Sequence, residues 1–297
     1  MTSRKSVARI GFGLLLAVLS SFLLLPPQVA GEKVPKKFSK RADASLSARK
    51  KQVQQELESL KDDSWAGHYY YGDGLGVNVE LDLAPKSGFA FTWNGCLGLY
   101  DMNYGDVVES GGTIRLAPQL PNQHKPFEGI APEFLPIVWG DRHYLIAKDE
   151  VVKFANAINA GFEPREGSWG MFFLKREDVS KSVTGNPRLP LEYSEYLLKH
   201  PIDAEISSVK NSRTSKSEQL TTVQFNVGAP QGVKKGMEFY LYVPSGFYAS
   251  ATVTDVNDTS SEAEISQCCG DKTGPPAVGW KLSTRAGRDA QNDGKSR

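Results

Sequence analysis

Apolar and polar residues alternate with a period of two along much of the chain after Trp65. The clearest example is Val77-Asn78-Val79-Glu80-Leu81-Asp82-Leu83, which alternates without a fault and predicts a strand with one buried and one solvated face. Residues 85–88 have turn chemistry, and the alternation resumes with aromatic residues at 89–93. Further strands are expected at 68–71, 105–109, 113–116, 137–139, 143–146 and 171–174. Short strands joined by tight turns predict a meander that closes as a barrel or curves strongly.

The glycine-rich stretch Gly72-Asp73-Gly74-Leu75-Gly76 allows two readings, a phosphate-binding loop or a turn. A phosphate-binding loop needs a helix directly after its glycines, and the nucleoside triphosphate type also needs a Lys-Ser/Thr pair. Here a strand pattern follows and no lysine stands at the required place. We therefore expect a hairpin turn in which Asp73 hydrogen-bonds its own backbone.

Helical spacing replaces the alternation at three places. Val53, Leu57 and Leu60 predict a short amphipathic helix, with Ser45 and Ser47 as candidate N-caps. Residues 151–158 predict a second helix, capped by Asp149 and ended by Gly161, and a last short helix is expected around Tyr193 and Tyr196.

Residues 202–285 form a separate set of predicted strands. We expect these strands at 204–206, 222–227, 237–243, 251–256 and 263–267. Their regular spacing is typical of a small barrel. The serine-rich segment 211–219 is expected to be a long exposed connection, and residues 286–297 a disordered tail.

The N-terminus has the order of a secretory signal. Arg4, Lys5 and Arg9 precede an uncharged apolar run at 10–25, and Pro26-Pro27-Gln28-Val29-Ala30 follows. Residues 1–30 are therefore expected to direct export. They are either a signal peptide cleaved after Ala30 or a retained N-terminal anchor, since about 20 residues are needed to cross a bilayer.

Residues 31–64 are expected to be a basic linker followed by the first helix. The basic side chains include Lys33, Lys36, Lys37, Lys40 and Arg41. They form either a solvated spacer or a contact for an anionic membrane surface. The chain as a whole has a formal net charge of +1, and few aromatic residues interrupt the basic run, so nucleic acid is not an expected partner.

Two family resemblances follow from short motifs. Trp65-x-Gly67-x-Tyr69, with Leu81-x-Leu83, Gly105-x-Val107 and Ile114-x-Leu116, resembles the start of lipocalin-like barrel domains of bacterial envelope proteins, in which a tryptophan, here matched to Trp65, plugs one end. The second resemblance, to small cradle-like β-barrels of rod-shape-determining and flagellar assembly proteins, is carried by three motifs: Gly228-x-x-x-Gly232-Val233-x-x-Gly236-Met237, Ala251-x-Val253-x-x-Val256 and Ser261-x-Ala263-x-Ile265.

The fold expected from pattern and resemblance together is mainly β (α+β). A lipocalin-like barrel or meander with added helices spans residues 65–200, and a small all-β barrel spans 202–285. The first resemblance implies an apolar ligand cavity and the second implies a role in assembling envelope structures. Neither transfers a catalytic residue, because the matched positions are structural glycines and core aliphatic residues.

Catalytic and metal-binding patterns are weak. The four histidines, His68, His124, His143 and His200, have no metal-ligand spacing, and His143, Asp141 and His68 are the least poor candidates for ligands. Two strand histidines and two loop histidines are the preferred interpretation, and neither a metal nor another cofactor is expected.

Acidic and cysteine residues give no clearer site. Asp101, Asp106 and Glu109, near Tyr100 and Tyr104, would suit a hydrolytic or sugar-binding cleft, but also ordinary loops. For Cys96, Cys268 and Cys269 we consider three reduced thiols first, then a Cys268–Cys269 pair, then a bridge from Cys96 to that loop.

Three functions remain open. The first is a non-enzymatic exported protein of the cell envelope that acts by interaction or as a scaffold. The second is a lipocalin-type binder of a small apolar ligand, for which the candidate ligand-binding residues are Tyr69, Tyr71, Phe89, Phe91 and Trp93. The third is a hydrolase with a cleft between domains, which would require histidines and acids to converge.

Overall fold

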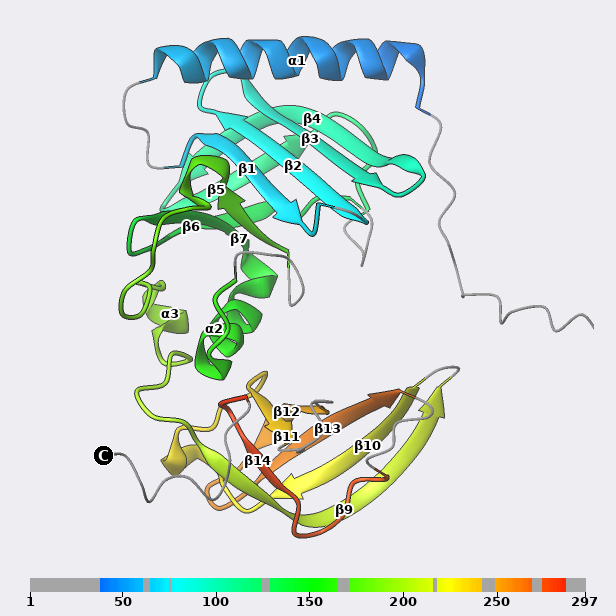
Figure 1. Ribbon diagram of the computed structural model, residues 1–297, viewed down its shortest axis with the longest axis vertical. Helices are drawn as coiled ribbons and strands as arrows, with labels where there is room; N and C mark the ends of the chain where they lie inside the picture. The colour runs from blue at the N-terminus through cyan, green and yellow to red at the C-terminus, as the bar shows by residue number, and fades with distance from the viewer. Residues whose placement is uncertain are drawn as a thin grey trace, which may run out of the picture. The chain divides into compact units, whose positions relative to one another are not determined.

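The computed structural model describes residues 38–60, 65–74, 76–123, 129–164, 171–215, 218–241, 249–268 and 274–286 (Figure 1). In these residues the chain is mainly β, and its strands form two closed barrels, one of eight strands and one of six. Both barrels belong to one compact unit of the chain, Val34–Arg297. The expected fold class is thereby confirmed.

The first barrel is an antiparallel meander in which each strand pairs with the next. Its strands are β1 (Gly67–Gly72), β2 (Val77–Ala84), β3 (Gly88–Gly95), β4 (Gly98–Ser110), β5 (Thr113–Pro118), β6 (Glu133–Trp139), β7 (Arg142–Ala147) and β8 (Phe172–Lys175). The barrel closes where β8 returns to β1, with Tyr69 opposite Lys175 and Tyr70 opposite Leu174. All the expected strands of this domain are present, and β4 extends further toward its N-terminus than the alternation predicts.

The turn between β1 and β2 is built by the side chain of Asp73. Its Oδ1 accepts hydrogen bonds from the backbone N–H of Gly76, at 2.8 Å, and of Val77, at 2.9 Å. The backbone N–H of Asp73 donates to the carbonyl of Val77. The prediction of a turn stabilised by Asp73 is confirmed, and Leu75 lies outside the described residues.

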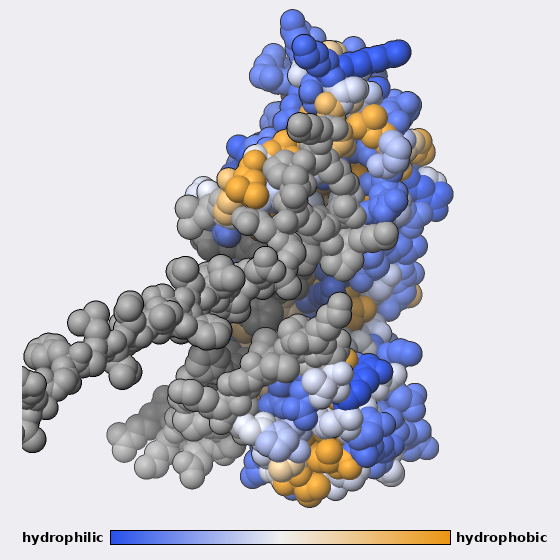
Figure 2. Space-filling view, turned by 90° about the vertical axis from the view of Figure 1, so that its right-hand side faces the viewer, coloured by the Kyte–Doolittle hydropathy of each residue, from blue (hydrophilic) through white to orange (hydrophobic). Residues whose placement is uncertain are grey.

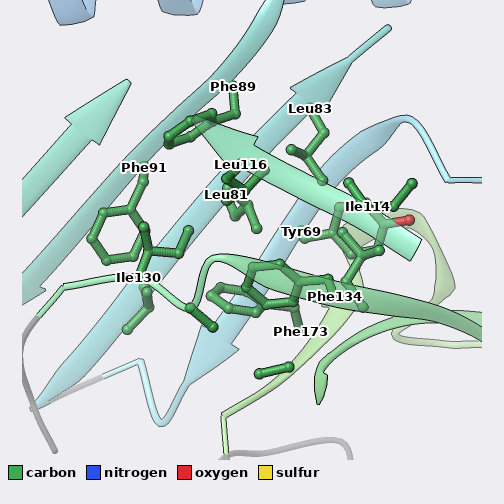
Figure 3. Close-up of a cluster of buried hydrophobic side chains, with 14 of the residues drawn as sticks. Tyr69, Leu81, Leu83, Phe89, Phe91, Ile114, Leu116, Ile130, Phe134 and Phe173 are labelled. Atoms are coloured by element: carbon green, nitrogen blue, oxygen red, sulfur yellow. The ribbon is translucent and has the colours of Figure 1, made fainter. Parts of the chain in front are cut away.

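The interior of the first barrel is filled by aromatic and aliphatic side chains (Figure 3). Fully buried members include Tyr69, Leu81, Phe89, Phe91 and Phe134. Phe134 and Phe173 meet edge to face, with ring centroids 5.9 Å apart, an arrangement that aromatic pairs favour. This cluster is the main core of the first barrel.

Helix α1 (Lys40–Ser59) packs on the outer face of β2, β3 and β4 (Figure 1). Arg49 Nη1 donates to the carbonyl of Ser87 at 2.5 Å, and the Glu56 carboxylate accepts from the backbone N–H groups of Lys86 and Ser87. The β2–β3 turn is thus held to the helix by charge-assisted hydrogen bonds, the stronger kind.

The predicted N-cap of α1 was wrong. Ser45 and Ser47 lie inside the helix, which is capped instead by Ser39, whose Oγ accepts from the backbone N–H of Ala42. Ala42, Leu46 and Val53 are the buried residues of the helix. Ala42 and Leu46 precede the periodic residues used for the prediction, so the apolar face begins earlier in the chain.

Helix α2 (Val151–Ala160) covers the outer face of β6, β7 and β8 and builds a second core around Phe154. Gly161 ends the helix with φ 88°, as predicted, because this left-handed conformation favours glycine. The predicted cap by Asp149 was wrong: that residue lies in the 3-10 turn η1 (Lys148–Glu150), and α2 has no side-chain cap. A second 3-10 turn, η2 (Arg176–Asp178), follows β8, and α3 (Leu191–Ser194) is a single helical turn.

The second barrel contains β9 (Asp203–Ser215), β10 (Glu218–Phe225), β11 (Glu238–Leu241), β12 (Ser250–Val256), β13 (Ser261–Cys268) and β14 (Lys281–Ser283), closed in the order β10-β13-β12-β11-β14-β9. A short 3-10 turn, η3 (Ala229–Gln231), follows β10. In the core of this second barrel, the rings of Phe225 and Phe239 pack together with their centroids 5.2 Å apart.

Two details of the second barrel differ from the sequence expectation. Within segment 211–219, expected to be a long exposed connection, residues 211–215 lie in β9 and residues 218–219 in β10, and Asn211 lies opposite Thr222. Cross-strand pairing overrides the polar composition there: residues 211–214 stay exposed, while β10 pairs with β13 on its other side. The closing strand β14 is only three residues long, too short for alternation to reveal.

Several predictions fall outside the described residues. These are the export signal at 1–30, Lys33, Lys36, Lys37, His124, Cys269 and the tail from 287. Lys40 and Arg41 are described and lie exposed in the first turn of α1. Among the described helices, none is both long and apolar enough to cross a bilayer.

A candidate binding pocket at the mouth of the first barrel

A pocket of about 660 Å³ lies where the start of β1, the start of β7 and the end of β8 meet the last turns of α1. Its charged and titratable residues are two histidines, two lysines and two glutamates: His68, His143, Lys175, Lys181, Glu58 and Glu177. Its wall is completed by Gln54, Leu57, Leu60, Ala66 and Gly67.

Strand geometry places this pocket at one mouth of the barrel. Tyr69, Leu145 and Phe173 belong to the interior core. Because side chains alternate across a strand, the residues two positions nearer the rim, Gly67, His143 and Lys175, lie on the same interior side. The pocket therefore lies above the filled core rather than within it.

Gly67 makes room for one of these side chains. The aliphatic stem of Lys175 occupies the space into which a Cβ at position 67 would project. The side chain of Lys175 is consequently only 12% exposed, while its ammonium group faces the carboxylate of Glu177 at 3.3 Å. Glu177 itself is 61% exposed, so this ion pair is partly screened by water.

His68 is held by a carboxylate on the neighbouring strand. It lies directly opposite Asp82 in the β1–β2 register, and its Nδ1 is 2.9 Å from Asp82 Oδ1. The hydrogen bond to Asp82 raises the pKa of His68, burial opposes the change, and the net pKa lies above the ordinary value. The imidazolium form is therefore favoured at this edge of the pocket.

His143 is held by a carboxylate from a different segment. Asp178 Oδ2 accepts from the backbone N–H of His143 at 2.7 Å and lies 2.8 Å from His143 Nδ1. Asp178 is fully buried, and its Oδ1 is 2.5 Å from Lys181 Nζ. Both pocket histidines thus have Nδ1 engaged by an aspartate, and among the described residues neither Nε2 has a hydrogen-bond partner.

Asp178 makes the stability of this region depend on pH. Burial raises the pKa of Asp178, but hydrogen bonds from Lys181 and His143 together lower it by more than burial raises it. The pKa in the folded protein therefore lies below that of the unfolded chain, about 3.9. The contribution of this carboxylate to the free energy of unfolding is present above about pH 4 and is lost as the pH falls through the lowered pKa.

We expect Asp178→Asn to reduce the free energy of unfolding, measured by urea titration, by about 2 kcal/mol at pH 7 and by less near pH 3. Asp255→Asn, at an exposed strand position, serves as the control; an equal loss at both pH values for Asp178→Asn would contradict the assignment.

The aromatic residues predicted to bind a ligand lie below this pocket. Tyr69, Phe89, Phe91 and Trp93 are buried in the interior core, and Tyr71 is partly buried against it. The hydroxyl group of Tyr69 donates to the carbonyl of Trp65 at 3.0 Å. Their role in binding a ligand stays a prediction.

The histidines considered as metal ligands come together only in part. His68 and His143 line one pocket, but Asp141 lies exposed in the β6–β7 turn and does not line it. Across the described ranges, no three His, Cys, Asp or Glu side chains are grouped closely enough to hold a metal ion.

The acids considered for hydrolysis have other contacts. Asp101 is buried and accepts from the backbone N–H groups of Met102 and Gly129, so it holds Gly129 shortly before β6. Asp106 pairs with Arg49 of α1 at 3.4 Å, and Glu109 is exposed on β4. Cys96 is an exposed free thiol.

The partners of the two histidines were missed by sequence reasoning. A signal for Asp82 existed, because the hairpin register that sets Gly72 opposite Asn78 also sets His68 opposite Asp82. Asp178 lies 35 residues after His143, and Lys175 enters the pocket only because β8 closes the barrel. Local pattern carries no signal for either contact.

Fold and pocket together define a closed β-barrel protein with a polar pocket at the mouth of its first barrel. On the face shown in Figure 2, hydrophilic residues cover much of the coloured surface and hydrophobic residues form separate patches. No protein-family model, curated protein or solved structure matches the chain.

Proposed function

We propose that the protein is an exported, non-enzymatic binding protein of the cell envelope. Its first barrel takes a small molecule at the mouth, and its second barrel supplies the contact to an envelope component. The observation that carries the binding role is the pocket of about 660 Å³ above the filled core. Barrel mouths are preferred places for small-molecule sites, and known pockets span roughly 300–1,000 Å³.

The barrel architecture supports this proposal. Eight strands enclose an interior just wide enough for side chains or one small ligand, as in lipocalins, and the proposed kinship with lipocalin-like envelope domains rests on this strand number and on Trp65. Since aromatic side chains occupy the interior, the ligand binds at the rim. The site proposed here is therefore formed by the pocket residues, and a ligand-binding role for the five aromatic residues stays a prediction.

The pocket wall indicates the kind of molecule. Leu57 and Leu60 pack against the core and offer an apolar surface, while the two histidine Nε2 atoms and two lysines offer hydrogen-bonding groups around it. A compact ligand with an apolar body and a polar group fits this division. The role of the second barrel is proposed from its separate closed core.

Two neighbouring glutamines of α1 provide a matched test of this site. Gln54 and Gln55 are both exposed, but only Gln54 lines the pocket. We expect Gln54→Trp to fill the pocket and reduce small-molecule binding at least about tenfold, equivalent to about 1.4 kcal/mol. Gln55→Trp should bind as the unmodified protein does. Fragment binding is measured by chemical-shift changes at Ala66, Gly67 and His143.

The outcome separates occupancy of this pocket from binding elsewhere. Fragments that bind both tryptophan variants equally, or that shift only residues of the second barrel, would overturn the proposed site. Native mass spectrometry of the full chain purified from its source provides an independent measurement, because a retained small molecule adds a defined mass.

A further inference from the structure

We propose that the ligand carries an anionic group, a carboxylate or a phosphate, and that Lys175 is the residue that anchors it. This inference rests on the proposed binding function and specifies its chemistry. The observation behind it is the unequal pairing of charges around the pocket.

The acids in and behind the pocket already have partners. Asp82 is engaged by His68, and Asp178 by His143 and Lys181. Glu58 accepts a hydrogen bond from Gln54 and is exposed on α1. These carboxylates are therefore paired or hydrated and do not need a cation from the ligand.

Lys175 is in the opposite position. An ammonium group has three N–H donors, and the partner of Lys175 among the described residues is Glu177, which is 61% exposed. The lysine side chain, in contrast, is 12% exposed and fixed over Gly67. The aliphatic part of Lys175 is thus largely buried, and its ammonium group lies at the pocket wall with donors to spare. This arrangement favours binding of an anion, because charge-assisted hydrogen bonds gain strength where water is excluded.

The histidines add to this preference. Both imidazoles line the same pocket with Nδ1 held by an aspartate, which fixes the ring and leaves Nε2 for a ligand. When protonated, His68 donates through Nε2, so charged donors around the pocket come from β1 and β8. A single anionic group within reach of two of these donors would be oriented as well as attracted.

The test uses benzoate, phenyl phosphate and benzamide with the full chain at pH 6.5. Benzamide has nearly the shape of benzoate but no charge, and phenyl phosphate distinguishes the two anionic groups. Dissociation constants are taken from chemical-shift titrations of Ala66, Gly67 and His143. We expect at least one anion to bind about tenfold more tightly than benzamide, the gain of one charge-assisted hydrogen bond.

Variants separate the anchor from general charge. Lys175→Met keeps the aliphatic stem and should abolish the preference for the anion while benzamide binding persists; Lys175→Arg should retain it. The control is Lys210→Met, which removes an ion-paired lysine of the second barrel and should change nothing. Thermal unfolding of each variant verifies that it is folded.

Each outcome has one meaning. Equal binding of benzamide and both anions would overturn the anionic preference and leave the binding proposal standing. Binding of none of the three probes at this pocket would count against both proposals. An anion preference that survives in folded Lys175→Met would overturn the assignment of Lys175 as the anchor.

Discussion

Phe91→Ala is expected to lower the free energy of unfolding by about 3–5 kcal/mol. Phe91 is fully buried on β3 in the interior core of the first barrel, opposite Leu81 of β2. Removal of its ring deletes apolar contacts and leaves a cavity that a closed barrel cannot easily collapse. Urea unfolding, followed by tryptophan fluorescence, measures the change.

The control is Val108→Ala on β4, where the side chain is largely exposed and the expected change is within about 0.5 kcal/mol. A loss below about 1.5 kcal/mol for Phe91→Ala, together with weaker ligand binding, would show that Phe91 borders open space. The aromatic residues would then line a ligand cavity, as the sequence suggested, instead of filling a core.

Period-two alternation was sufficient to predict a strand such as β2, which has one fully buried face and one partly exposed face. Residues 77–83 show why: Val79, Leu81 and Leu83 are fully buried and the polar residues between them are not. The prediction failed where another interaction decides structure. Ser39 caps α1 through a local hydrogen bond that apolar periodicity does not register, and β14 is too short to show any period.

The candidate pocket was predictable only in part, for the same physical reason. His68 and Asp82 are neighbours across one hairpin, so their contact follows from the turn and the register. His143 and Asp178 are brought together by the η2 turn after β8, and Lys175 by closure of the barrel. Contacts of this kind depend on the whole topology, so the local pattern pointed instead to the aromatic residues of the strands, whose role in binding a ligand stays a prediction.

Arg142→Met is expected to destabilise the protein by about 3 kcal/mol, as measured by urea unfolding. Arg142 is completely buried at the start of β7. Its Nη1 is 2.6 Å from Glu163 Oε1, and its Nε donates to the carbonyl of Lys181 at 2.7 Å. Methionine fills part of the volume but replaces none of these polar contacts. Because Glu163 is 37% exposed, water can solvate the carboxylate left behind. The loss of unfolding free energy therefore stays near the lower end of the range expected when one partner of a buried ion pair is removed.

The same substitution connects stability with binding. The guanidinium of Arg142 holds the backbone of Lys181, whose side chain lines the pocket and pairs with Asp178. Arg142→Met should therefore also weaken fragment binding, as long as the variant remains folded. The control is Arg115→Met, which breaks an ion pair of an arginine side chain that is 60% exposed. It should change the free energy of unfolding by no more than about 1 kcal/mol and leave binding unaltered. Normal binding by a destabilised Arg142→Met protein would show that the segment after β8 keeps its place without the arginine, and that the pocket is set by the barrel rim alone.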